Sequence, residues 1–345
     1  MNYRNNLKTF LLSVLLFFFL YPSLFASENH EQEGKKKFDA GKFILGHISD
    51  QHDWHLWGHT SIPLPVILYS PEKGISIFFS NKFKHGHAAY NSYRLNEHGK
   101  IFSEDGSKFY DFSITKNVAS LFISVIFLLL IFISVARSYD RRKEQAPKGL
   151  QSLLEPIIFF VRDDIVKTAI GEKKYEKYLP YLLTLFFFIW INNIMGLIPF
   201  FPGGANLTGN IAVPMTLAIF TFLITISIAN KNYWRHVFAM PGIPIGVLPL
   251  ITVIEIIGIF LKPLVLIIRL FANITAGHII ILSFISLIFI FAEMNMWLGA
   301  SVSIVSVVFA LFMNVLELLV GFLQAYVFTL LTSMYFGSAI EEAHQ

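Results

Sequence analysis

The apolar positions of this chain gather into long runs that short polar segments separate. Residues 118–136, 178–201 and 211–229 each form one such run, long enough to cross the roughly 30 Å hydrocarbon core of a membrane as a helix. Two further runs, at about 247–292 and 297–338, each reach about twice that length. Each is either a pair of spans or one strongly tilted helix, and the lack of a charged turn within them favours tilted helices. The pattern predicts about five membrane crossings.

Two segments outside these runs carry different patterns. Residues 150–170 mix leucine, isoleucine and phenylalanine with charges such as Glu155 and Arg162, which favours an amphipathic helix in the membrane interface. At the start of the chain, positive charges precede an apolar run at 10–20, the pattern of a cleaved signal peptide at 1–26. An uncleaved first helix is the alternative, but that run would span only about 16 Å.

Residues 27–115 form a polar region that holds eight of the eleven histidines. The sequence at 71–74 predicts a turn before a strand at 75–80, so we expect a small strand-containing domain here.

A cluster of ionisable side chains lies within this region. His55 and His59 are four residues apart and would suit a metal ion if the segment were helical, but its strand-like flanks weaken that reading. Proton buffering near an ion entrance is a second reading, and a structural or surface role is the third. The cluster consists of His47, His52, Asp53, His55 and His59.

Composition limits the class of protein. Of 345 residues, 54% are hydrophobic and 14% are charged, which excludes a disordered chain and an ordinary soluble domain. The sequence has no cysteine, so disulfides, thiolate metal sites and a cysteine nucleophile are excluded. The net charge of +4 is small for this length, and we expect no nucleic-acid partner. No phosphate-binding glycine loop or catalytic triad is evident, so we expect neither an enzyme nor a cofactor.

Positive charge predicts the orientation in the membrane. Lysine and arginine are frequent at 137–177 and 231–235, whereas 202–210 and 293–296 contain neither. Because positive segments remain in the cytoplasm, five crossings place residues 27–115 outside and the C-terminus inside, in agreement with a signal peptide.

The sequence therefore predicts an all-α polytopic membrane protein. It has about five crossings, two of them long tilted helices, one interfacial amphipathic helix and a small strand-containing N-terminal region. We divide it into a signal peptide at 1–26, an extracytoplasmic histidine-rich region at 27–115 and a membrane domain at 116–345.

Ionisable side chains inside the apolar runs are costly, so each is a candidate for function. Glu255, Lys262 and Arg269 follow at intervals of seven, which places them within about 40° of one another on a helix. Glu317 and Gln324 are also seven apart. Each long helix therefore presents a narrow polar seam.

Arg269 allows two roles, because a guanidinium stays charged even when it is partly desolvated. It either pairs with Glu255 or Glu317 and stabilises packing, or it holds a fixed positive field that a mobile carboxylate must pass. His278 lies about 180° around the helix from Arg269. It is either a hydrogen-bonded core histidine or a proton relay, with Glu317 as a possible partner.

The run at 261–278 closely resembles the signature of subunit a of the F-type ATP synthase. In that signature, five residues separate a proline from an arginine-leucine-phenylalanine triplet, and an asparagine and a glycine follow. The resemblance continues through 317–328, which is similar to the last helix of the family. Residues 193–199 and 209–213 match its middle hairpin, so the resemblance covers about 116–345.

The resemblance implies a static subunit beside a rotating ring of c subunits. An ion enters one half-channel, neutralises a rotor carboxylate, travels with the ring and leaves through a second half-channel. By similarity, Arg269 is the essential arginine between the two and disfavours a protonated rotor acid. The other side chains implied in the ion path are Glu255, Asn273, His278, Glu317 and Gln324.

One departure from the family pattern concerns two of these positions. Some relatives carry an acid at the position of His278 and a histidine at the position of Glu317, so the two types are exchanged here. An exchange of this kind predicts that the two side chains lie close together and act jointly.

The implied partners are the c-subunit ring, the b-subunit stalk, the soluble F1 ATPase sector and the lipid bilayer of the inner (plasma) membrane. The chain itself would be a non-catalytic channel subunit. A secondary transporter with a mid-membrane Arg–Glu substrate site is the alternative, although no internal repeat is visible. A receptor-like module that uses the histidine-rich exterior is a third reading. Co-purification with a c ring and a soluble ATPase would distinguish the first reading from the second.

Overall fold

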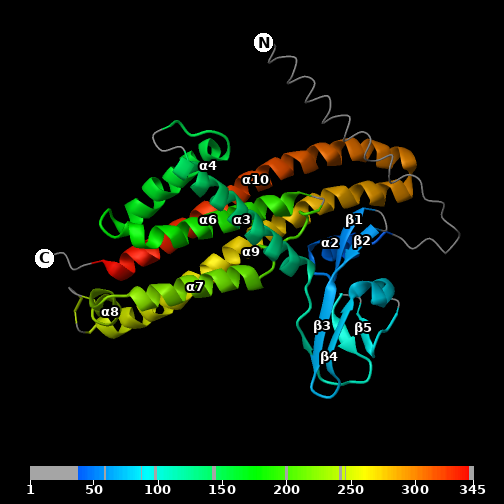
Figure 1. Ribbon diagram of the computed structural model, residues 1–345, viewed down its shortest axis with the longest axis horizontal. Coiled ribbons are helices and arrows are strands. Elements are labelled where there is room, and N and C mark those ends of the chain that lie inside the picture. The colour runs from blue at the N-terminus through cyan, green and yellow to red at the C-terminus, as the bar shows by residue number, and fades with distance from the viewer. Residues whose placement is uncertain are drawn as a thin grey trace, which may run out of the picture.

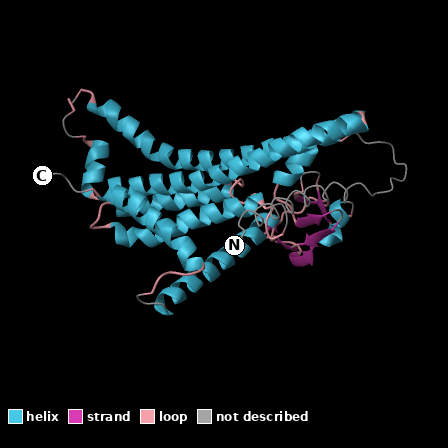
Figure 2. Ribbon diagram, turned by 90° about the horizontal axis from the view of Figure 1, so that it is seen from above, coloured by secondary structure: helices cyan, strands magenta, loops and turns pink. Residues whose placement is uncertain are grey.

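The computed structural model describes residues 38–57, 60–86, 88–96, 99–141, 145–198, 201–240, 243–244 and 246–341. The predicted signal peptide at 1–26 lies outside the described residues. Helices make up most of the described chain, and Figure 2 shows the strands gathered at one end of the molecule. The predicted all-α membrane fold with a small strand-containing N-terminal region is confirmed.

The N-terminal region begins with a short helix and continues as three small antiparallel sheets. Their strand orders are β1-β2, β4-β3-β7 and β5-β6. Alternate residues of β3, Val66 and Leu68, point into a core that also contains Phe78 and Tyr93, as expected for a half-buried strand. The elements are α2 (Ala40–Ile48), β1 (Asp53–Trp57), β2 (Thr60–Pro63), β3 (Pro65–Ser70), β4 (Gly74–Phe79), η1 (Ser80–Gly86), β5 (Tyr93–Leu95), β6 (Ile101–Ser103) and β7 (Tyr110–Asp111).

The predicted turn at 71–74 joins β3 to β4, so this part of the strand prediction is confirmed. The helical reading of the histidine cluster is wrong, because His55 lies in β1, whose register pairs it with Ser61. His59 lies outside the described residues.

The described part of the membrane domain consists of helices, and four of them are long and apolar enough to cross a membrane. Helices α7 and α8, bent by 103°, provide a fifth crossing if they are counted as one span. The prediction of about five crossings is confirmed. The elements are α3 (Lys116–Arg141), α4 (Leu150–Phe160), η2 (Val161–Lys167), α5 (Thr168–Ile170), α6 (Tyr175–Leu197), α7 (Ala212–Ile228), α8 (Lys231–Phe238), α9 (Leu248–Met294) and α10 (Met296–Ile340).

Helices α9 and α10 correspond to the two longest apolar runs, for which the sequence allowed either one tilted helix or a pair of spans. Each is a single continuous helix, of 47 and 45 residues, or about 70 Å at 1.5 Å per residue. They run side by side along the molecule as an antiparallel hairpin (Figure 1). A helix of this length fits a hydrocarbon core of about 30 Å only with a strong tilt.

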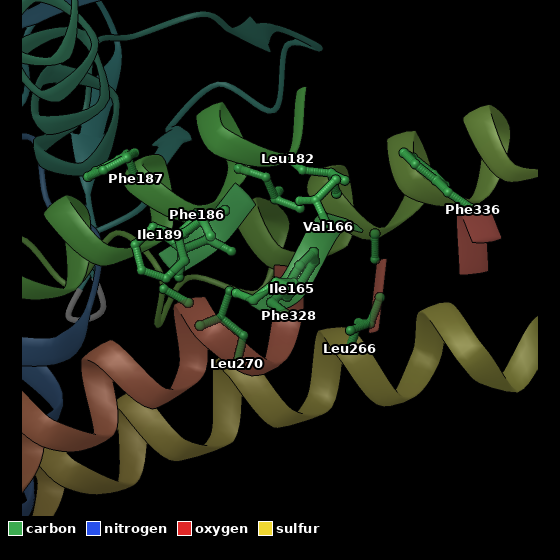
Figure 3. Close-up of a cluster of buried hydrophobic side chains, with 14 of the residues drawn as sticks. Ile165, Val166, Leu182, Phe186, Phe187, Ile189, Leu266, Leu270, Phe328 and Phe336 are labelled. Atoms are coloured by element: carbon green, nitrogen blue, oxygen red, sulfur yellow. The ribbon is translucent and has the colours of Figure 1, made fainter. Parts of the chain in front are cut away.

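A hydrophobic core holds this hairpin against the other helices (Figure 3). Phe186 and Phe187 of α6, Leu266 and Leu270 of α9 and Phe328 of α10 are almost completely buried together. Within a membrane, close van der Waals packing of this kind holds helices together, because lipid tails are as apolar as the buried side chains. The core fixes the rotation of α9 and α10, and with it the direction in which their polar seams face.

Candidate functional site

Arg269 lies near the middle of α9, beside the stripe that attaches the helix to the core. Leu266, Leu270 and Ile274 are buried at intervals of four, the spacing of one helix face. Arg269 is offset from Leu270 by about 100°, and its side chain is partly exposed. On its other flank, Ile268 is 54% exposed. The arginine therefore sits at the boundary between the packed interior and an open apolar face.

No described residue forms an ion pair with Arg269. The described salt bridges place Glu317 with His278 and leave Glu255 without a basic partner within ion-pairing distance. The aromatic ring of Tyr335 lies within electrostatic range of the guanidinium. Of the two roles for Arg269, the structural pairing with Glu255 or Glu317 is therefore not found in the described part of the chain.

His278 and Glu317 meet across α9 and α10, as their exchanged residue types predict. The distance from Nδ1 of His278 to Oε1 of Glu317 is 3.7 Å, and the glutamate side chain is 4% exposed. Neither carboxylate oxygen receives a hydrogen bond from a described residue. A carboxyl group in such a place is costly while it stays charged and unpaired, so a proton carried between these two groups relieves that cost.

Gly277 makes this approach possible, and Gly196 lies against the histidine. A Cβ added at Gly277 would lie 2.7 Å from Cδ and from Oε1 of Glu317, closer than real side chains approach. A Cβ at Gly196, near the end of α6, would lie 3.6 Å from Nε2 of His278. The pair is thus enclosed by the backbones of α9 and α6.

A second polar group lies at the end of α6, in the neighbourhood of this pair. The side-chain amide of Asn193 donates to the carbonyl of Gly321 (2.8 Å), and its carbonyl accepts from the hydroxyl of Thr208 (2.7 Å). Thr275 of α9 donates to the carbonyl of Gly209 at 3.3 Å. These bonds join α6, α9, α10 and the loop between α6 and α7, and they hold the walls around His278 in place.

Between Arg269 and the start of α9, the polar seam is lined by different groups. The ammonium of Lys262 lies 5.5 Å from the centre of the Tyr335 ring, a cation–π contact. Both side chains line a cavity of about 20 Å³ together with Thr221 and Tyr233. Glu255 is partly exposed and lies within electrostatic range of Tyr233. Polar groups thus continue from Arg269 toward the beginning of α9.

The remaining two predicted residues occupy opposite surroundings. Gln324 is 8% exposed and Glu317 is 4% exposed, so the seam of α10 faces the interior of the helices. Asn273, one turn beyond Arg269, is exposed on α9. The structure therefore brings His278 and Glu317 together, and it leaves Asn273 on the open face that carries Arg269.

The histidine cluster of the N-terminal region is dispersed in the fold. His47 lies on α2, while His52 contacts the carbonyl of Gly99 at 3.1 Å and Asp111 at 3.7 Å. Asp53 accepts a hydrogen bond from Ser80. No group of metal-binding side chains occurs within the described residues.

Sequence reasoning missed three contributors to this site. Asn193 is a polar side chain buried in an apolar span, and the same cost that singled out the charged residues could have marked it. Thr208 lies in a loop, where a hydroxyl gives no signal. Lys116 is 8% exposed at the start of α3 and lies within electrostatic range of His278, a relation between residues far apart in the sequence.

Comparison with known proteins identifies the family that this chain resembles. Residues 118–337 match the family model "ATP synthase A chain", and residues 43–120 match a model described as a domain of unknown function, DUF8433. The chain is 44% identical over 246 residues to ATP synthase subunit a of Chloroherpeton thalassium, which covers 68% of this chain and 71% of that protein. It is 45% identical over 244 residues to ATP synthase subunit a of Pelodictyon phaeoclathratiforme, covering 68% of each chain.

A third relative extends the agreement. ATP synthase subunit a 2 of Prosthecochloris aestuarii is 43% identical over 244 residues, which covers 68% of this chain and 72% of the relative. With the family model matched over the long hairpin and the site it carries, the chain belongs to the ATP synthase A chain family, the membrane subunit of the proton-translocating Fo sector.

Proposed function

We propose that this chain provides two proton half-channels beside a ring of c subunits, with Arg269 as the charge barrier between them. The observation that carries the proposal is the guanidinium in the middle of α9, which no described residue pairs. The acid–base pair of His278 and Glu317 lies toward one end of the helix, and Lys262 and Glu255 lie toward the other. The chain itself catalyses no covalent reaction in this proposal.

The His278–Glu317 pair is the entry group of one half-channel. A proton that arrives at the pair passes between a carboxylate and an imidazole, both of which bind and release protons readily. Asn193 and Thr208 hold the walls, while Gln324 continues the polar seam along α10. A rotor carboxylate that receives the proton is neutral and moves away from Arg269.

The second half-channel begins on the other side of Arg269. The guanidinium favours the ionised form of a rotor carboxylate, so the proton is released before the carboxylate passes. The cavity beside Lys262 and Tyr335, and Glu255 beyond it, line the exit. The same positive field opposes a cation that would cross directly from one half-channel to the other.

The face beside Arg269 is the contact surface for the ring. Ile268 is 54% exposed, Leu264 is 47% exposed and Asn273 lies exposed between the apolar residues. The further partners proposed are the b-subunit stalk and the soluble F1 sector, with the lipid bilayer around the remaining helices.

The distribution of lysine and arginine supports the orientation. The ends of α3, α6 and α8 that carry these residues face the cytoplasm of the inner (plasma) membrane, and the N-terminal region lies outside. The proposal keeps the division into a signal peptide at 1–26, an extracytoplasmic region at 27–115 and a membrane domain at 116–345.

The test is ATP-driven proton pumping in inverted vesicles that carry Arg269→Ala, with Arg269→Lys and wild type beside it. Loss of one charge at close range in partly wet protein changes the barrier by a few kcal/mol, so pumping by Arg269→Ala falls about a hundredfold. Assembly is checked by the amount of c ring that co-purifies. An assembled Arg269→Ala complex that pumps at the wild-type rate overturns the proposal.

A further inference from the structure

The N-terminal region meets the membrane domain on the half of the α9–α10 hairpin that carries the His278–Glu317 pair. Helix α2 packs along α9, where the Phe38 and Phe289 rings lie 5.1 Å apart. The backbone N–H of Phe38 also donates to Glu293 at 2.6 Å. Figure 1 shows α2 and β1 beside the end of the α9–α10 hairpin.

A second contact reaches the loop between α6 and α7. The Trp54 ring of β1 lies 5.2 Å from the Phe201 ring. The same loop carries Thr208, whose hydroxyl bonds to Asn193. The N-terminal region therefore touches two of the elements that enclose His278.

A third contact joins the region to the start of α3 through charged groups. Asp50 accepts from the hydroxyl of Thr115 (2.8 Å) and from the backbone N–H of Asn117 (3.0 Å), so it caps the helix. The ammonium of Lys116 donates to the carbonyl of His47 at 3.3 Å and is 8% exposed.

Two of these groups lie within electrostatic range of His278. Lys116 and His47 both act electrostatically on His278, and Glu317 faces it from α10. A contact that only holds two domains together is stabilised best by apolar packing, because the desolvation of a buried ammonium costs free energy that its partners rarely compensate. Here the ring contacts lie at Phe289 and Phe201, with Glu293 beside the first. The buried ammonium of Lys116 lies apart from them, at the start of α3.

We infer that the N-terminal region forms the outer vestibule of the extracytoplasmic half-channel. Asp50, His47 and Lys116 line its inner end, and α2 and β1 form its walls. Protons pass this polar vestibule before they reach His278 and Glu317. The inference rests on the proposed function and gives a role to the part of the chain that matches the domain of unknown function.

The test uses the natural absence of cysteine from the chain. His47→Cys places a single thiol at the inner end of the vestibule, and Lys42→Cys places a matched one on the same exposed helix, about 140° around it. Spheroplasts with the assembled complex are treated with membrane-impermeant thiosulfonates of similar size, one cationic and one anionic. Inverted vesicles are then prepared, and labelling and proton pumping are measured.

We expect both thiols to be labelled and only the His47→Cys complex to lose pumping. The cationic adduct should reduce it about three- to tenfold more than the anionic one, the effect of one charge over a few ångströms. A structural role would not produce this dependence on the sign of the charge.

Full labelling of His47→Cys with unchanged pumping overturns the inference, and so does a thiol that no reagent reaches. Arg269→Ala in the same membranes keeps the two proposals apart. If Arg269→Ala loses pumping while labelled His47→Cys keeps it, the half-channel proposal stands and the vestibule inference fails. If Arg269→Ala still pumps, the half-channel proposal itself fails.

Discussion

Two histidine–carboxylate pairs in this protein have the same separation but differ in burial and in hydrogen bonding. His278 and Glu317 lie 3.7 Å apart between α9 and α10, and His52 and Asp111 lie 3.7 Å apart in the N-terminal region. The Asp111 side chain is 36% exposed and accepts a hydrogen bond from the N–H of Ser113 at 2.9 Å. Glu317 is 4% exposed, and no described residue donates to its oxygens.

The difference separates a structural pair from the pair that we propose carries protons. Asp111 stays charged with backbone and solvent support, so it can remain in one state. A buried carboxylate without donors has no stable charged state of its own, so its protonation follows what its neighbours do. Distance alone would not have distinguished the two pairs, whereas burial and hydrogen bonding do.

Exchanging the two residues of the membrane pair is the strongest test of this comparison. His278→Glu alone sets two acids against each other, and Glu317→His alone sets two imidazoles together, so each should reduce pumping about 10- to 100-fold. The double exchange rebuilds an acid–base pair and should return to within about threefold of wild type. Pumping is measured in inverted vesicles, and a double variant no better than either single one shows that the two groups do not act as a pair.

Crowding the pair without changing its chemistry gives the next largest effect. Gly277→Ala places a methyl group 2.7 Å from the Glu317 carboxyl, so that side chain must move, and we expect pumping to fall about tenfold. Gly258→Ala on the same helix is the matched control, because its Cβ meets nothing within 4 Å. Equal pumping by the two variants would mean that the contact with Glu317 does not matter.

The support around the membrane pair can be tested through stability. Asn193→Ala leaves the carbonyl of Gly321 and the hydroxyl of Thr208 without their partner, which costs about 1–3 kcal/mol for each buried group. The temperature at which the subunit leaves the purified complex should fall. Asn232→Ala, on the exposed part of α8, provides the comparison and should leave that temperature unchanged. A fall of the same size in both would remove the special role of Asn193.

Much of this architecture follows from the sequence, and the rest depends on contacts that no local pattern contains. The long apolar runs predicted α9 and α10, but only the packing of Leu266, Leu270 and Phe328 decides that each is one helix facing the core. The exchanged residue types of His278 and Glu317 predicted their contact. The close approach of Glu317 to Gly277, the hydrogen bonds of Asn193 and the electrostatic influence of Lys116 arise from tertiary packing, so the sequence could not reveal them.

The smallest expected effect lies at the outer pair and separates it most clearly from the inner one. Burial raises the pKa of Asp111, but the nearby His52 and the hydrogen bonds from Ser113 lower it more, so the pKa lies below its ordinary value. A carboxylate of this kind stabilises the folded region above its ordinary pKa, and the contribution is lost as the pH falls through the pKa of the folded state. Because the side chain is 36% exposed, solvent screening limits the effect to less than about 1 kcal/mol.

Asp111→Asn should therefore make the N-terminal region somewhat less stable at neutral pH. The stability of the variant should no longer fall below about pH 4, because it has no carboxylate to protonate at this position. Limited proteolysis of the region on spheroplasts measures this, with acid-active protease at a series of pH values. Proton pumping at neutral pH should stay at the wild-type level, because the support of Asp111 comes from His52 and Ser113 and none of it from the membrane pair. A loss of pumping comparable to that of Glu317→His would instead mean that the outer pair carries protons too, and burial would no longer be what separates the two pairs.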